Sequence, residues 1–259
     1  MPIALITGAS SGIGLELAKI FASKKTDLVL VARSENKLIE LSNELKSKYA
    51  ISAYVLAKDL STINAAKEVV DYCKQNNLHI DYLINNAGFG DHGFFAESDL
   101  EKQLEMINLN ITALVYLTRL LLPPMIQKGA GKIMNVASTA AFQPGPLMSI
   151  YFATKAFVLS FSEAISNELE KTGVTVTALC PGATESGFQK AASVEDSKMV
   201  KGKKLPSSAE VAAFGYRTMM KGKVVAIHGL LNTVMTTGVR FAPRSLIRKI
   251  ARSLQEKAS

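Results

Sequence analysis

The chain has 259 residues, of which 48% are hydrophobic and 20% are charged, a balance typical of a globular protein with a sizeable core. Its two cysteines, Cys73 and Cys180, stand in unrelated contexts. This argues against a disulfide framework or a cysteine-ligated metal and suits a reducing compartment. The apolar run at residues 1–7 is too short for a signal peptide, and the run at residues 117–126 is interrupted by Arg119 and two prolines. We therefore expect a soluble, cytoplasmic protein.

The formal net charge of +8 is unevenly distributed along the chain. Residues 1–197 carry 17 basic and 20 acidic side chains, whereas residues 198–259 carry 13 basic and only 2 acidic ones. An asymmetry of this size can mark a segment that contacts a polyanion or a membrane.

Short β-branched runs alternate with longer segments of helical period. Strands are predicted at residues 3–7, 27–32, 51–57, 80–85, 132–137, 174–180 and 224–228. Helices are predicted at residues 14–23, 35–49, 62–76, 99–122 and 151–171. This alternation predicts an α/β, Rossmann-like, doubly wound parallel sheet of about seven strands with helices on both faces.

We expect a single domain over residues 1–259, because no Pro/Gly/Ser-rich stretch separates two blocks. The pattern is weakest at residues 183–206, which are polar and rich in lysine. In a doubly wound fold, an excursion after a late strand often covers the ligand crevice, so we expect a substrate-covering loop there.

A glycine-rich loop joins the first predicted strand to the first helix. Its residues are Gly8, Ala9, Ser10, Ser11, Gly12, Ile13 and Gly14. Glycines allow a tight turn and close backbone approach, and the helix N-terminus offers free N–H groups to a pyrophosphate. The spacing differs from the usual dinucleotide fingerprint, and a plain glycine turn is the alternative. The position between strand and helix favours a dinucleotide site.

The second predicted strand ends at Ala32 and is followed by Arg33 and Ser34, with no carboxylate to bind a ribose 2′-hydroxyl. A guanidinium can hold a 2′-phosphate through two hydrogen bonds. Arg33, assisted by Ser34 and Lys37, therefore favours NADP(H). The alternative is a solvated arginine at the start of a helix.

Tyr151 and Lys155 are four residues apart on a predicted helix, so their side chains share one face. A protonated lysine beside a phenol stabilises phenolate and is expected to lower its pKa toward neutrality, as general acid–base chemistry requires. The pair Tyr54 and Lys58 has the same spacing but lies on a predicted strand, where four residues span roughly 13 Å. Spacing alone is therefore uninformative.

The position of Ser138 distinguishes the pair Tyr151 and Lys155 from the pair Tyr54 and Lys58. It follows the apolar strand ending at Ala137 and precedes Tyr151 by 13 residues. The carboxyl ends of parallel strands face the ligand crevice, so Ser138 is expected beside the site. Tyr54 has Leu41 at the matching position.

Together these motifs resemble the short-chain dehydrogenase/reductase family over residues 3 to about 185. The matching residues, in family order and spacing, are Thr7–Gly14, Asn85-Asn86-Ala87-Gly88, Asn108, Ser138, Tyr151-x3-Lys155 and Pro181-Gly182. The resemblance implies that Asn108 holds a proton-relay water beside the catalytic residues Ser138, Tyr151 and Lys155.

The resemblance also implies further contacts with the cofactor. Asp59, with Leu60, is expected at the adenine, and Lys155 at the nicotinamide ribose. Asn86, Ala87, Gly88, Pro181 and Gly182 are expected to line the cofactor, and either Thr184 or Ser186 to bind the nicotinamide amide.

In the reaction implied by the resemblance, Ser138 binds a carbonyl oxygen, NADPH delivers hydride to the carbon, and Tyr151 donates the proton. Residues expected near the substrate are Phe89, Phe142, Gln143, Pro144, Leu147 and Phe188. A largely apolar pocket favours a hydrophobic ketone, 3-oxoacyl thioester, steroid-like or xenobiotic carbonyl, although each of these side chains is also compatible with the core. The sequence does not distinguish carbonyl reduction from alcohol oxidation.

Other functions are weaker alternatives. A nonenzymatic NADP-sensing regulator on the same fold would not need a proton relay. The three histidines, His79, His92 and His228, lack ligand spacing, so no metal is expected. A homo-oligomer, either a homodimer or a homotetramer, is expected.

The last 22 residues, 238–259, are predicted to form a basic amphipathic C-terminal extension. From Pro243 a helical stripe of apolar residues lies opposite Arg244, Arg248, Lys249 and Arg252. Three interpretations stay open: packing on the domain or a sister subunit, peripheral contact with an anionic membrane, and nucleic-acid contact. The last is disfavoured because the chain offers no aromatic platform or DNA-reading motif, so no nucleic-acid partner is expected.

Overall fold

The strands form one parallel sheet whose order reverses next to the first strand. The computed structural model describes residues 1–198 and 200–256, and within them seven strands pair in the order β3-β2-β1-β4-β5-β6-β7. The strands are β1 Ile3–Thr7, β2 Asp27–Ala32, β3 Ala53–Ala57, β4 Tyr82–Asn85, β5 Gly131–Val136, β6 Val174–Cys180 and β7 Val225–Ile227. The predicted Rossmann-like fold class is confirmed.

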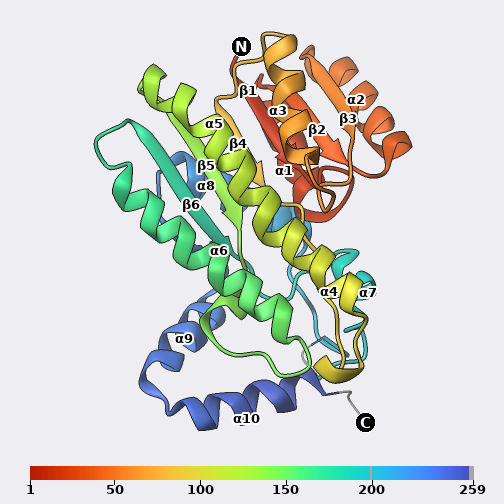
Figure 1. The fold of residues 1–259 in the computed structure, drawn as a ribbon, viewed down its shortest axis with the longest axis vertical. Coiled ribbons are helices and arrows are strands. Elements are labelled where there is room, and N and C mark those ends of the chain that lie inside the picture. The colour runs from red at the N-terminus through yellow and green to blue at the C-terminus, as the bar shows by residue number, and fades with distance from the viewer. Residues whose placement is uncertain (199, 257–259) are drawn as a thin grey trace.

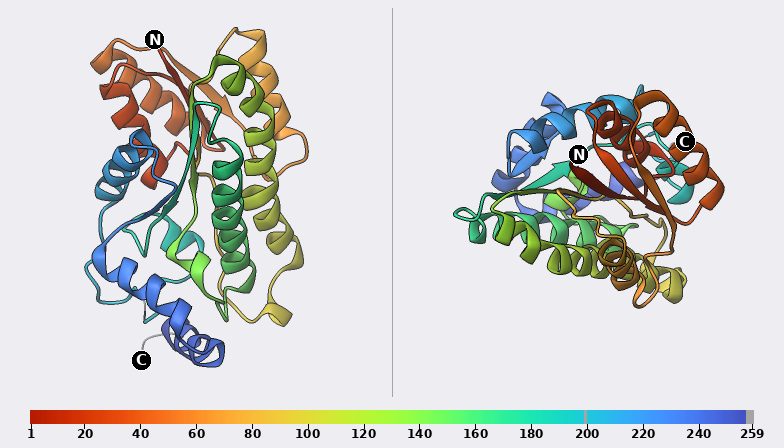
Figure 2. Two further views of the ribbon diagram at one scale, coloured as in Figure 1. Left: turned by 90° about the vertical axis from the view of Figure 1, so that its left-hand side faces the viewer. Right: turned by 90° about the horizontal axis from the view of Figure 1, so that it is seen from above.

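Helices cover both faces of the sheet, as Figure 2 shows in the view from above. One face is covered by α1 (Gly12–Ser23), α2 (Glu35–Tyr49) and α8 (Ser208–Met220). The other is covered by α3 (Ala65–Gln75), α5 (Leu114–Lys128) and α6 (Ser149–Glu168). The remaining helices, α4 (Leu100–Ile107), α7 (Phe188–Ala191), α9 (Leu230–Gly238) and α10 (Arg244–Gln255), gather toward the lower end of the molecule in Figure 1.

The strands are continuous apolar runs because both of their faces are buried. In β1, Ile6 belongs to the core under α1 and α2, whereas its neighbour Leu5 belongs to the core under α3 and α5. Both side chains are fully buried. Alternate residues of one strand thus serve two separate cores.

The predicted helix end at residue 122 is wrong, because α5 continues through Pro123 and Pro124 to Lys128. Leu121 and Met125 flank the prolines and stay buried against the sheet, so packing offsets the lost backbone hydrogen bonds. The continuous helical stretch Leu100–Lys128, which includes α4 and α5, is long enough and apolar enough by composition to cross a membrane. Because its inner side packs on the sheet, we interpret this helix as a wall of the fold.

The sheet topology also determines where a ligand can bind. The connections leave β1 in opposite directions, toward β2 and toward β4, and both pairings are parallel. A crevice opens at such a switch point beyond the carboxyl ends of the strands. These ends face α7, α9 and α10 in Figure 1.

Candidate active site

A cavity of about 440 Å³ lies at the carboxyl ends of the strands. It runs from Arg33, after β2, past Ser138 and Tyr151 to Leu254 on α10. Its volume is within the range of small-molecule and cofactor sites. Nearly every predicted site residue lines this one cavity, although the residues come from eight separate segments of the chain.

The glycine loop forms one wall of the cavity. Gly8 and Gly12 have positive φ angles of 66° and 57°, which favour glycine. A Cβ on Gly14 would lie 2.3 Å from the carbonyl oxygen of Gly8, so Gly14 supports the loop from behind without lining the cavity. Ser11, the N-cap of α1, makes no side-chain capping bond within the described part of the chain. The first amides of α1 are therefore available to a phosphate.

Thr7 and Asn86 join this loop to the end of β4. The Thr7 hydroxyl accepts hydrogen bonds from the backbone N–H groups of Asn86 (3.0 Å) and Ala87 (2.9 Å). The Asn86 amide donates in return to the Thr7 carbonyl at 2.9 Å. The two strand ends are thereby held together, and residues 86–88 form the adjoining cavity wall.

Basic side chains gather at the far end of the cavity from Tyr151. Arg33, Lys37 and Lys58 line it there together with Asp59 and Leu60. The Arg33 side chain is 76% exposed, and its Nη1 atom lies 3.9 Å from Oδ2 of Asp59. Lys58 is held by an ion pair with Glu68 at 2.5 Å, so this end can offer the Arg33 guanidinium and the Lys37 ammonium to an anionic group. With the glycine cradle, which a Cβ would fill, these residues fit a dinucleotide.

Ser138 and Tyr151 meet in the middle of the cavity. Ser138 follows β5 and is the N-cap of the 3₁₀ turn η3 (Thr139–Phe142), where its hydroxyl accepts from the Ala140 N–H at 3.0 Å. The same hydroxyl donates to the Pro181 carbonyl at 3.4 Å. The Tyr151 ring, on the first turn of α6, lies 5.2 Å from the ring of Phe188. Both hydroxyl-bearing side chains are buried and face one space.

Lys155 lies one turn beyond Tyr151 on α6. Its Nζ atom donates to the Val136 carbonyl at 2.7 Å and lies 5.8 Å from the centre of the Tyr151 ring. Burial lowers the pKa of Lys155 to about 8. Burial also raises the pKa of Tyr151 to about 12, although a hydrogen bond with Ser138 opposes this increase.

The expected lowering of the Tyr151 pKa is therefore not found, because removing the phenol from water outweighs the effect of its neighbours. A phenol with this pKa is neutral at physiological pH. Carbonyl reduction requires this protonated form of the phenol, because the phenol must donate a proton.

The role predicted for Asn108, holding a relay water, stays a prediction, and the structure places a second asparagine closer to the cavity wall. Asn108 is half-buried and does not line the cavity, whereas Asn110 is 2% exposed and lies directly behind it. Asn110 donates to the Thr154 hydroxyl at 3.0 Å and the Phe89 carbonyl at 3.0 Å. Its Oδ1 accepts from the Phe89 N–H at 3.1 Å.

Both asparagines lie in a π-helical segment, η2 (Asn108–Ala113), between α4 and α5. Such segments are frequent at functional sites. Helical spacing distinguishes the two asparagines, because Asn110 shares the buried stripe of Met106, Ala113 and Leu117, and Asn108 does not.

Residues of the late loop supply the wall opposite the glycines. Pro181, Gly182, Thr184 and Ser186 all line the cavity, so the structure leaves both candidates for the amide contact in place. The Thr184 hydroxyl donates to the Gly182 carbonyl at 3.0 Å. Further residues of the predicted covering loop line the cavity as well: Gly187, Phe188, Gln189, Ala191, Val194 and Val200.

The substrate end of the cavity agrees with the prediction at Phe89, Gln143 and Phe188 and differs at Phe142. Phe142 packs into a core cluster with Leu159 and does not line the cavity. Pro144 and Leu147 do not line it either. Sequence reasoning missed Met148, Phe152, Ala251, Leu254 and Gln255.

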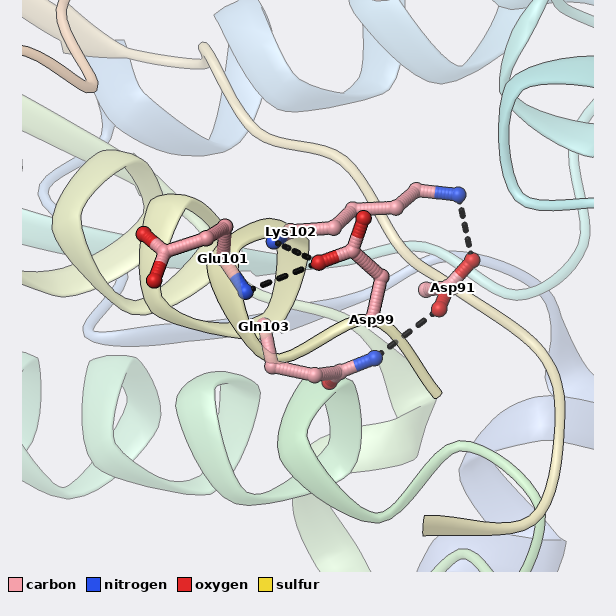
Figure 3. Close-up of polar contacts among 5 residues, drawn as sticks. All are labelled: Asp91, Asp99, Glu101, Lys102 and Gln103. Carbon is pink, nitrogen blue, oxygen red and sulfur yellow. Dashed lines mark hydrogen bonds and ion pairs between the residues drawn. The ribbon is translucent and has the colours of Figure 1, made fainter. Parts of the chain in front are cut away.

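The segment after β4 holds α10 over the cavity. Asp91 accepts from Lys102 Nζ at 2.5 Å and from Gln103 Nε2 at 2.8 Å, which fixes the segment to α4 (Figure 3). Asp99 caps α4 by accepting from the N–H groups of Glu101 and Lys102.

Two contacts then join this segment to the C-terminal helix. His92 Nε2 lies 2.8 Å from the Gln255 carbonyl oxygen, and the Arg252 guanidinium lies 5.0 Å from the centre of the Phe94 ring. The inner stripe of α10 therefore packs on its own domain. The final residues of the predicted extension, 257–259, lie outside the described residues.

Comparisons with known proteins extend the likeness beyond the motifs. A family model described as short chain dehydrogenase matches residues 2–197. The very-long-chain 3-oxoacyl-CoA reductase of Rattus norvegicus is 31% identical over 250 residues, covering 92% of this chain and 77% of the rat protein.

Two solved structures resemble nearly the whole chain. A short-chain dehydrogenase from Sphingobium yanoikuyae, in complex with NADPH, is 34% identical with a TM-score of 0.83, covering 96% of this chain and 97% of that one. The bulky-bulky ketone specific alcohol dehydrogenase from Comamonas testosteroni is 30% identical with a TM-score of 0.79, covering 96% of both chains. The likeness therefore extends to the late loop and the C-terminal helices.

Proposed function

The chain belongs to the short-chain dehydrogenase/reductase family, and we propose that it is an NADP(H)-dependent reductase of hydrophobic ketones or 3-oxoacyl compounds. One observation carries this proposal. Ser138 and Tyr151 bring two hydroxyl groups together in a single cavity that is cationic at one end and largely apolar at the other. This combination suits an oxidoreductase acting on a CH–OH/C=O pair, because one hydroxyl can bind the carbonyl oxygen while the other donates the proton.

The preference for NADP(H) is supported by the end of β2. Ala32 ends the strand without a carboxylate, and Arg33 and Lys37 line the cavity where they can neutralise a 2′-phosphate. The amides at the start of α1 would hold the pyrophosphate, and Lys155 the nicotinamide ribose. When bound, NADPH supplies the hydride that reduces the carbonyl carbon.

The protein's own groups act on the carbonyl oxygen. Ser138 donates a hydrogen bond to this oxygen and positions it beside the Tyr151 hydroxyl. As the carbon is reduced, negative charge grows on the oxygen and Tyr151 transfers its proton there, which completes the alcohol. The Lys155 ammonium stabilises the tyrosinate that remains, until a proton from solvent restores the phenol.

Asn110 positions this machinery without touching the substrate. Its bonds to Phe89 and Thr154 tie the cavity wall after β4 to the α6 turn that carries Lys155. The Asn110 Nδ2 and Oδ1 atoms both make hydrogen bonds to protein groups, namely to Phe89 and Thr154. A change here would displace Lys155 relative to Tyr151.

The substrate class is supported by the lining of the far end. Phe152, Phe188 and Leu254 leave an apolar space next to Tyr151, which suits an aliphatic or aromatic ketone. The names of the rat 3-oxoacyl-CoA reductase and the bulky ketone dehydrogenase are consistent with such substrates.

The direct test is NADPH consumption by the full chain with ketones, 3-oxoacyl thioesters, quinones and aldehydes, repeated with NADH. We expect turnover of a hydrophobic ketone or 3-oxoacyl thioester with NADPH. A strong preference for NADH would overturn the cofactor assignment. NADPH binding without turnover of any carbonyl would favour a nonenzymatic NADP-sensing protein instead.

A further inference from the structure

Large apolar side chains are exposed on three consecutive elements at the C-terminal end of the fold. They are Leu230, Leu231 and Val234 on α9, Phe241 in the 3₁₀ turn η4 (Val239–Phe241), and Leu246 and Ile250 on α10. Leu230, Leu231 and Phe241 are 81%, 71% and 85% exposed. Exposed apolar side chains clustered in this way mark an interaction surface. We call these six residues the α9–α10 surface.

Basic side chains accompany these apolar ones. Arg240 stands beside Phe241, and Arg244, Arg248 and Lys249 are exposed on α10. Helix α10 contains no acidic residue. The segment 198–259 as a whole carries 13 basic and 2 acidic side chains. The surface therefore combines apolar side chains with a strong positive charge.

The domain covers only part of the apolar stripe of α10, and the rest of the stripe is exposed to solvent. Ala251 and Gln255 are buried against the cavity, whereas Leu246 and Ile250, beside them on the helix, are about half exposed. A helix that only packed on its own domain would not need apolar residues there. An amphipathic helix that lies in a membrane interface has such a stripe, with basic residues next to it that reach the headgroups.

From these observations we propose that the α9–α10 surface docks on an anionic lipid bilayer. Charge distinguishes this occupant from a second copy of the chain. Two copies meeting through this surface would bring their basic segments together, which is unfavourable, whereas anionic headgroups would neutralise Arg240, Arg244, Arg248 and Lys249. Burial of the apolar side chains at the acyl boundary adds a term that is independent of charge.

The position of the surface links docking to the active site. Helices α9 and α10 lie together at one end of the molecule, beyond the carboxyl ends of the strands (Figures 1 and 2). The inner side of α10 lines the cavity through Ala251, Leu254 and Gln255. A docked protein would hold this cavity wall next to the bilayer, so an apolar carbonyl substrate could enter from the lipid. This last step rests on the proposed function, whereas docking does not.

The test is flotation of the full chain with vesicles of phosphatidylcholine alone and of phosphatidylcholine mixed with phosphatidylserine. We expect the protein to float with the anionic vesicles, and less so as salt is raised. The double variant Leu231→Ser/Phe241→Ser should bind at least about tenfold more weakly, because both side chains lose their apolar contact. The matched control is Ile39→Ser/Ile126→Ser, which removes two exposed apolar residues from α2 and α5 and should float as the wild type does.

Other outcomes overturn the proposal. Wild-type protein that stays unbound with anionic vesicles excludes membrane docking. If light scattering then shows a dimer that the Leu231→Ser/Phe241→Ser variant dissociates, the occupant is a second copy. Equal loss in the control pair would mean that the effect is not specific to the α9–α10 surface. NADPH oxidation with a water-soluble ketone, measured without vesicles, reports on the proposed function separately, because neither Leu231 nor Phe241 lines the cavity.

Discussion

The Asn110 side chain donates a 3.0 Å hydrogen bond to the hydroxyl of Thr154, the residue that directly precedes Lys155. Thr154 in turn donates to the Tyr151 carbonyl at 2.7 Å. The π-helical segment between α4 and α5 is thereby connected to the turn of α6 that carries both Tyr151 and Lys155. The position of the acid–base pair consequently depends on Asn110.

Replacing Asn110 with alanine should lower kcat by more than about tenfold, because the turn carrying Lys155 loses its partner and a misplaced group costs heavily in rate. NADPH affinity, measured by fluorescence titration, should change far less. The matched control is Asn108→Ala, which changes the same residue type in the same segment but removes no cavity contact. If Asn108→Ala lowers kcat more than Asn110→Ala does, Asn108 and not Asn110 supports the acid–base pair.

The rate of reduction should depend on the charge of Lys155. Its pKa of about 8 means that the ammonium is present below that pH and is lost as the pH rises through it. Because the charge stabilises the tyrosinate, kcat should fall above about pH 8, approaching tenfold per pH unit. The Lys155→Arg variant keeps its charge over this range, so any residual activity should lack that decline. A wild-type rate that stays level well above pH 8 would contradict this role.

Arg33 should determine the choice between the two nicotinamide cofactors. Its removal in Arg33→Ala deletes charge-assisted hydrogen bonds to the 2′-phosphate, so KM for NADPH should rise by about 10- to 100-fold. KM for NADH should stay nearly constant, since NADH lacks this phosphate. Arg119→Ala, which removes an exposed arginine from α5, serves as the control. Equal effects of Arg33→Ala on both cofactors would exclude 2′-phosphate recognition.

His92 should help to hold α10 over the substrate end of the cavity. Because its ring nitrogen lies 2.8 Å from the Gln255 carbonyl oxygen, His92→Ala should loosen the last turn of α10. We expect KM for a bulky ketone to rise by several-fold, the loss of about one hydrogen bond, with little change in KM for NADPH. His79→Ala changes an exposed histidine that does not line the cavity and should leave both constants unchanged. A selective loss of NADPH affinity would place the effect of His92 at the cofactor end of the cavity and contradict its role in holding α10 over the substrate end.

Much of this arrangement could be predicted from the sequence because it depends on local patterns. The continuous apolar runs that become β1 and β2 reflect strands buried on both faces, and the loop from Gly8 to Gly14 requires glycine at specific backbone positions. Ser138 could be placed because the carboxyl ends of parallel strands meet at one edge of the sheet.

The features that were missed depend on tertiary contacts. Ala251 and Leu254 reach the cavity only because α10 folds back across it, and no local signal encodes that approach. The pKa of Tyr151 follows from burial, which spacing alone does not reveal. Phe142 looks like a pocket residue in sequence, but it follows Ser138 on a 3₁₀ turn that directs it into the core.

The central claim is that the Tyr151 hydroxyl is the proton donor, and the Tyr151→Phe variant tests it most directly. Phenylalanine retains an aromatic ring beside Phe188 and removes only the hydroxyl, so the cavity should keep its shape. We predict that carbonyl reduction falls by at least about 10²-fold while NADPH affinity, measured by fluorescence titration, is nearly unchanged. A variant that binds NADPH normally and keeps more than about a tenth of the wild-type rate would contradict this role for Tyr151.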